Sequence, residues 1–80
     1  MNPIDSLLAA LGDDPSDEVA WQALADALEE AGEPLRAELL RLTRRLPALK
    51  RGARGRAAAE RRVQRLLLDG VRPCWPQIAN

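Results

Sequence analysis

The sequence predicts an all-α fold: three to four short helices in a small bundle, with a C-terminal antiparallel helical hairpin and an extended tail. Leucine and alanine dominate its apolar residues, and both rank high in helix propensity. β-Branched residues, which favour strands, are few. Glycines and prolines divide the 80 residues into segments of helix length. A chain of this length suits one small domain, so we expect residues 1–70 to be helical and residues 71–80 to be a tail or linker.

The first helix is expected to begin at Pro3, with Asn2 as its N-cap. Its apolar residues recur at i, i+3, i+4 and i+7, which makes one stripe for packing. These residues are Ile4, Leu7, Leu8 and Leu11. Gly12 suits the left-handed position that ends a helix.

The second helix is expected to have Asp14 as its N-cap and Pro15 as its first residue, and to end near Ala31 before Gly32. Small residues dominate its inner face and allow close approach of a neighbouring helix. This face consists of Ala20, Ala23, Leu24, Ala27, Leu28 and Ala31. Trp21 is the one large side chain and is expected at the edge of the stripe.

Two further helices complete the predicted hairpin. The third begins at Pro34 and ends or kinks at Pro47, and its leucines follow a short heptad pattern. They are Leu35, Leu39, Leu42 and Leu46. A basic, glycine-containing connector over residues 50–56 leads to a fourth helix over residues 56–69, which Gly70 ends. Because the connector is short, the two helices are expected to lie antiparallel.

Charge is balanced over the chain but divided between its halves. Residues 1–40 carry ten acids and one base, a net charge of −9, and residues 41–80 carry eleven bases and two acids, a net charge of +9. This division predicts either two halves that attract each other or a basic face offered to a partner.

The composition excludes several classes of function. Without histidine, and with one cysteine, the chain offers no zinc finger, no histidine-based triad and no disulfide framework. We expect no enzyme activity, no cofactor and no bound metal. No apolar run reaches the length of a membrane span, and the N-terminus lacks the features of a signal peptide, so we expect a cytoplasmic protein that does not enter a membrane.

Four segments, residues 7–10, 14–17, 25–34 and 36–42, resemble the bacterial repeat-companion domain. In that family an Ala-Asp-Trp-Leu-Glu-Glu run precedes Gly-Asp/Glu-Pro and a segment ending in Arg-Leu; here the run is Ala-Asp-Ala-Leu-Glu-Glu, followed by Gly-Glu-Pro. Ala27 stands at the tryptophan position, and Trp21 is expected to compensate. The resemblance implies a non-catalytic adaptor module at the N-terminus of a larger bacterial protein, whose partner is another protein or a C-terminal module. Residues 70–76 resemble the junction to such a module.

The candidate binding residues fall into two groups. The expected partner-binding surface is a leucine-rich groove with basic and aromatic neighbours, comprising Leu39, Leu40, Arg41, Arg44, Arg45 and Trp75. An acidic helix face is expected to dock against arginines of this chain or of another, a role favoured over a metal or acid–base site, and comprises Asp26, Glu29, Glu30 and Glu33.

Alternatives stay open for both partners and local contacts. The basic segment 41–65 is compatible with nucleic-acid binding, although no aromatic residue interleaves with it. Self-association into a helical dimer is a further alternative. Trp75 either latches onto the helical core, the favoured interpretation, or anchors a partner. For Cys74 a packed position is favoured over a reactive thiol.

Overall fold

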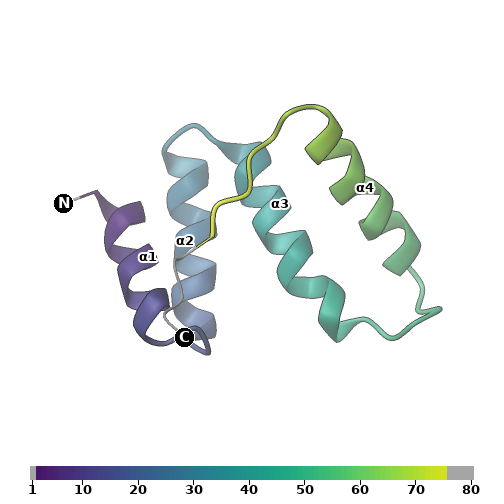
Figure 1. Ribbon diagram of the computed structural model, residues 1–80, viewed down its shortest axis with the longest axis horizontal. Helices are drawn as coiled ribbons and strands as arrows, with labels where there is room; N and C mark the ends of the chain where they lie inside the picture. Colours follow the sequence, from purple (N-terminus) through teal and green to yellow (C-terminus); the bar gives the residue numbers. More distant parts are fainter. Residues whose placement is uncertain (1, 76–80) are drawn as a thin grey trace.

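The computed structural model describes residues 2–75 of the chain. Within them the chain folds into four α-helices and no strand, which confirms the all-α prediction (Figure 1). The elements are α1 (Pro3–Asp13), α2 (Glu18–Glu30), α3 (Pro34–Arg45), the 3₁₀ turn η1 (Leu46–Ala48) and α4 (Arg56–Leu68). Helices α3 and α4 lie antiparallel, as the predicted hairpin requires (Figure 1).

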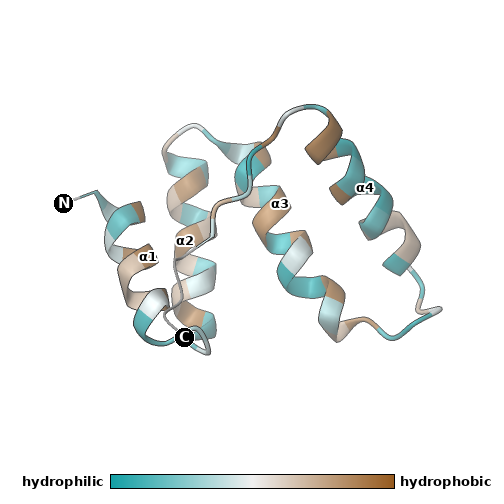
Figure 2. Cartoon of the chain, in the orientation of Figure 1, coloured by the Kyte–Doolittle hydropathy of each residue, from teal (hydrophilic) through white to brown (hydrophobic). Residues whose placement is uncertain are grey.

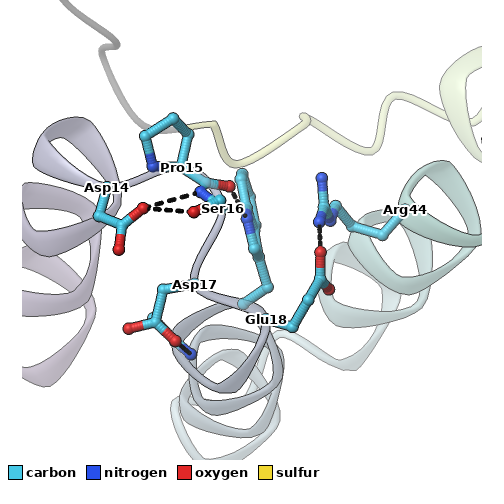
Figure 3. A network of polar contacts seen from close by, with 8 residues as sticks. Asp14, Pro15, Ser16, Asp17, Glu18 and Arg44 are labelled. Atoms are coloured by element: carbon cyan, nitrogen blue, oxygen red, sulfur yellow. Dashed lines mark hydrogen bonds and ion pairs between the residues drawn. The ribbon is translucent and has the colours of Figure 1, made fainter.

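The start of α1 follows the prediction, and the start of α2 does not. Asn2 caps α1 by accepting a hydrogen bond from the Ile4 amide at 2.9 Å. Helix α2 begins three residues later than expected, with Asp17 as its N-cap. Asp14 instead accepts from the amide and hydroxyl of Ser16, at 3.2 and 2.6 Å, and closes a tight turn (Figure 3). The prediction of an Asp14 cap is therefore wrong, because that carboxylate is used within the connecting turn.

Left-handed glycines end two helices as predicted. Gly32 follows α2 with φ 83° and Gly70 follows α4 with φ 89°. In both turns the residue after the glycine donates its amide back to a helical carbonyl, Glu33 to Leu28 and Val71 to Leu66. Gly12 does not have this role, since α1 continues through it to Asp13. The predicted stop at Gly12 is therefore wrong.

The main core forms where α1, α2 and α3 pack together. Its buried residues come from all three helices and from the tail: Leu11, Ala20, Trp21, Leu24, Ala25, Leu28, Ala37, Leu40 and Cys74. Helix α4 stands outside this core and packs on α3, burying Ala59 and Leu66. Figure 2 shows the corresponding pattern, with hydrophobic and hydrophilic stretches alternating along each helix.

The segment after α4 returns to the core. It passes back across α3 toward α2 (Figure 1), and the Arg36 guanidinium fixes it by donating from Nε to the Arg72 carbonyl at 3.0 Å. Cys74 is buried in the core. The helices end near residue 70, where the boundary was predicted. Residues 71–75, however, pack with the helices in one unit, because Cys74 completes the core. Residues 76–80, the rest of the predicted tail, lie outside the described residues.

Candidate interaction surface

The leucines expected to line a partner groove are part of the interior. Leu39 is 1% exposed and Leu40 is 2% exposed, so neither offers a surface to a partner. These two leucines are consecutive in the sequence, and both are buried because α3 packs against α2 on one side and α4 on another. The leucine-rich groove is therefore not present as predicted, and these leucines stabilise the fold.

The acidic face of α2 docks against an arginine of the same chain. Arg41 of α3 donates to Asp26 at 2.7 Å and also pairs with Glu29. The hydrogen bond that Arg41 donates to Glu29 raises the pKa of Arg41, so the guanidinium stays charged. At the end of the same face, Glu33 pairs with Arg36 at 3.0 Å. Among residues 2–75, Glu30 makes no such ion pair. Three of the four predicted acidic residues are thus used within the chain, which accounts for part of the charge division.

Trp21 is the aromatic centre of the surface between α2 and α3. Its ring is buried, and its Nε1 donates to the Pro15 carbonyl at 2.8 Å. The Arg44 guanidinium carbon lies 4.4 Å from the ring centroid, a cation–π arrangement. Arg44 also pairs with Glu18, and Figure 3 shows the two side chains facing each other. These contacts hold the start of α2 to the end of α3.

Trp75 lies against Trp21. The ring centroids are 6.1 Å apart and the planes meet at 72°, an edge-to-face pair. Trp75 is also half exposed, so the contact latches the returning segment while leaving part of the indole at the surface. Next to it, burial raises the pKa of Cys74, and the thiol stays protonated at neutral pH. The packed interpretation of Cys74 agrees with this position.

A groove of about 480 Å³ lies between α2 and α3. We call it the α2–α3 groove; its lining residues are Glu18, Trp21, Gln22, Ala25, Asp26, Leu40, Arg41, Arg44, Arg45 and Ala48. Apolar atoms of Trp21, Ala25 and Leu40 contribute to its walls, together with three arginines and two carboxylates. Two of those arginines pair with the carboxylates, and Arg45 makes no ion pair among the described residues. The groove is therefore partly apolar with one available cation.

The structure thus brings three of the predicted partner-binding residues, Arg41, Arg44 and Arg45, to one groove, whose base includes the buried Leu40, whereas Leu39 does not line it. Their neighbours in the groove include Glu18, Gln22 and Ala25, which were not among the predicted residues. A helical period would have found them, because positions 18, 22 and 25 recur on one face of α2 together with Trp21.

The other basic residues of segment 41–65 divide into two groups. Arg56 pairs with Glu60 at 2.9 Å, Arg62 with Glu38 at 2.6 Å and Arg65 with Asp69 at 3.3 Å. The second group has no ion pair within residues 2–75 and consists of Lys50, Arg51, Arg54 and Arg61, besides Arg45 of the groove. Only part of the basic segment is therefore available to a partner.

No helix among residues 2–75 is long and apolar enough to cross a membrane. No group of three histidine, cysteine, aspartate or glutamate side chains comes together there in a way that could hold a metal ion. Comparison with protein-family models, curated proteins and solved structures gives no match for this chain.

Proposed function

We propose that the domain is a non-catalytic protein-interaction module, of the adaptor type that its resemblance to the repeat-companion domain implies. Its binding site is the α2–α3 groove. Its ligand is a short peptide segment of another protein, or of a C-terminal module, in which an acidic side chain follows or precedes an apolar one. The observation that supports this assignment is the combination, in one groove, of apolar wall atoms with Arg45, a cation without a carboxylate partner.

The groove has the size and chemistry for an apolar side chain. Its volume of about 480 Å³ falls within the range of ordinary ligand sites, which combine apolar walls with a few placed polar groups. Trp21 and Leu40 are held in place by the core and are only 5% and 2% exposed, so the few atoms of each that line the groove need little ordering on binding. Burying an apolar side chain there supplies the affinity.

The charges around the groove favour a carboxylate partner over a phosphate chain. Glu18 and Asp26 on the α2 side pair with Arg44 and Arg41, so Arg45 is the one groove charge without an ion pair among the described residues, which is too little to hold a run of phosphates. Arg45 lies at the end of α3, where one carboxylate can reach it without meeting both acids. A ligand with one acidic side chain matches this arrangement.

Selection from a library of random peptides displayed on phage tests the proposal. We expect enriched peptides to share an acidic residue beside an apolar one. Arg45→Glu should weaken their binding at least about tenfold, because an attraction is replaced by a repulsion. Gln22→Trp, at an exposed groove position, should also weaken it by filling the space. Arg72→Glu is the matched control, since it makes the same charge change at an exposed residue that does not line the groove.

Two results would overturn the assignment. One is the absence of peptides enriched above a display control. The other is a set of enriched peptides that bind the Arg45→Glu and Gln22→Trp variants as tightly as the unchanged domain. Circular dichroism of each variant confirms that the helices are intact before binding is compared.

A further inference from the structure

Four of the six cations that make no ion pair among residues 2–75 lie in the loop before α4 or in α4 itself, and the other two are Arg45 and Arg72. Lys50, Arg51 and Arg54 lie on the loop between η1 and α4, and Arg61 lies in the first half of α4. All four side chains are exposed, and none has an acidic group within ion-pair distance among residues 2–75. We call these four residues the cationic end. The sequence indicated only a long basic segment, whereas the structure separates these cations from those already neutralised.

The loop that carries three of the four cations has a defined backbone. The Ala53 amide donates to the Lys50 carbonyl at 2.8 Å, and the Arg56 amide donates to the Ala53 carbonyl at 3.1 Å, which makes two consecutive turns. Gly52 and Gly55 have φ of 81° and 90°, the left-handed conformation that such turns need. The loop therefore presents its cations from a fixed path.

Arg56 fastens this loop to the rest of the fold. Its guanidinium donates to the Leu46 carbonyl at 2.9 Å and to the Leu49 carbonyl, and its Nε pairs with Glu60 at 2.9 Å. Glu60 is the one acidic residue within the segment from residue 41 to residue 68. Because Arg56 neutralises it, no free carboxylate of this segment offsets the four cations.

The surface between the cations has no apolar anchor. The intervening residues are small, namely Gly52, Ala53, Gly55, Ala57 and Ala58. A protein partner usually contributes large apolar or aromatic side chains to well-packed pockets at the centre of an interface, and no large apolar pocket is available here. Exposed cations on a surface without such pockets instead match a chain of phosphates, which is bound by charge.

The field of the molecule favours approach at this end. The acids that make no ion pair among the described residues lie on α1, on α2 and on the turn between them: Asp5, Asp13, Asp14, Asp17 and Glu30. The formal net charge of zero therefore conceals a separation, with negative charge on α1 and α2 and positive charge at the α4 side. A polyanion is repelled from the first region and attracted to the second.

We propose that the cationic end binds the phosphate backbone of nucleic acid without reading its sequence. This inference goes beyond the proposed function, since it uses different residues and a different partner. Contacts of this kind carry a defined salt dependence, because each neutralised phosphate releases bound counterions. Four contacts to duplex DNA predict a slope of log K against log salt of about −3.6, which is about a 150-fold loss of affinity between 50 and 200 mM salt.

Fluorescence anisotropy with a short labelled DNA duplex tests the proposal. The unchanged protein should bind with the steep salt dependence above. Arg54→Gln removes one phosphate contact and should make the slope less steep by about 0.9, from about −3.6 to about −2.7. Arg72→Gln is the matched control, because it removes another exposed cation without an ion pair from outside the cationic end, and it should leave the slope unchanged. A second duplex of unrelated sequence should bind equally well.

Three outcomes would overturn the proposal. The first is no binding of the duplex at low salt. The second is a fourfold variant, with glutamine at positions 50, 51, 54 and 61, that binds with the affinity and salt slope of the unchanged protein. The third is displacement of the duplex by poly-glutamate as effectively as by unlabelled DNA. The last result would assign this end to an acidic protein. Peptides selected on the α2–α3 groove should bind the fourfold variant as tightly as the unchanged protein. Loss of the nucleic-acid proposal would therefore not affect the proposed peptide-binding function, which the phage selection tests separately.

Discussion

Replacing Leu66 by alanine tests how α4 is held to the rest of the molecule. Helix α4 buries only Ala59 and Leu66, and Leu66 is 1% exposed. Leu68, two residues later on the same helix, is 82% exposed. The two leucines have the same chemistry and helix propensity, so Leu68→Ala serves as the control for everything except burial.

The burial of each leucine sets the expected loss of stability. Leucine to alanine removes three carbon groups, each worth about 0.8 kcal/mol when buried, which gives about 2.4 kcal/mol at Leu66. The cavity left behind adds to this, but α4 is an outer helix that can settle onto α3, so we expect about 2.5–3 kcal/mol in total. For Leu68 the buried remainder is less than a fifth, and the same calculation gives about 0.4 kcal/mol.

Urea unfolding followed by circular dichroism measures these free energies. For a domain of this length, the Leu66 variant should also melt about 10–20 °C lower than the unchanged protein. An equal m-value in both variants shows that the unfolded chains expose similar surface. A Leu66→Ala variant within 0.5 kcal/mol of Leu68→Ala would refute the packing of α4 on α3 described above.

Two further predictions concern the returning segment and the ion pairs. Trp75→Ala should lower the free energy of unfolding by more than about 1 kcal/mol, because it removes both the edge-to-face pair with Trp21 and the buried half of the indole. Urea unfolding measures this loss, and unchanged stability would contradict the contact. The hydrogen bond from Arg62 holds the pKa of Glu38 below its ordinary value of 4.5. This ion pair therefore stabilises the fold at neutral pH and is lost as the pH falls below 4.5, where Glu38 becomes protonated. In urea titrations, the free energy of unfolding of the Glu38→Gln variant should therefore fall less between neutral and acid pH than that of the unchanged protein. An equal fall in both proteins would count against the pair.

Helix boundaries could be predicted where the deciding contacts are local. Asn2, which directly precedes Pro3, marks the start of α1, and Gly32, two residues before Pro34, marks the end of α2. Both signals lie in neighbouring residues alone. The start of α2 could not be decided in this way, because Asp14 and Asp17 are equally able caps. Two contacts distinguish them: the Asp14 carboxylate is used in the Ser16 turn, and the Trp21 indole donates to the Pro15 carbonyl once the ring is packed in the core.

Burial in α3 was the least predictable part of the candidate surface. Leucine spacing indicates one apolar stripe, but Leu39 and Leu40 are adjacent and both are buried. Only the position of α3 between α2 and α4 explains this, and that position is a property of the whole fold. Charge patterning was more informative, since attraction between the acidic and basic halves was one of its two interpretations, and Arg41 on the α2 face agrees with it.

The burial of Cys74 in the core of α1, α2 and α3 also determines when that core can close during synthesis. The ribosome adds about 5–20 residues per second, so the 29 residues from the end of α3 to Cys74 take about 1–6 s. Helical bundles fold in microseconds to milliseconds, far faster than this delay. The three helices therefore wait on the ribosome with part of their interior uncovered. In that interval a chaperone, or a neighbouring nascent chain, has access to the apolar surface that the last segment later covers.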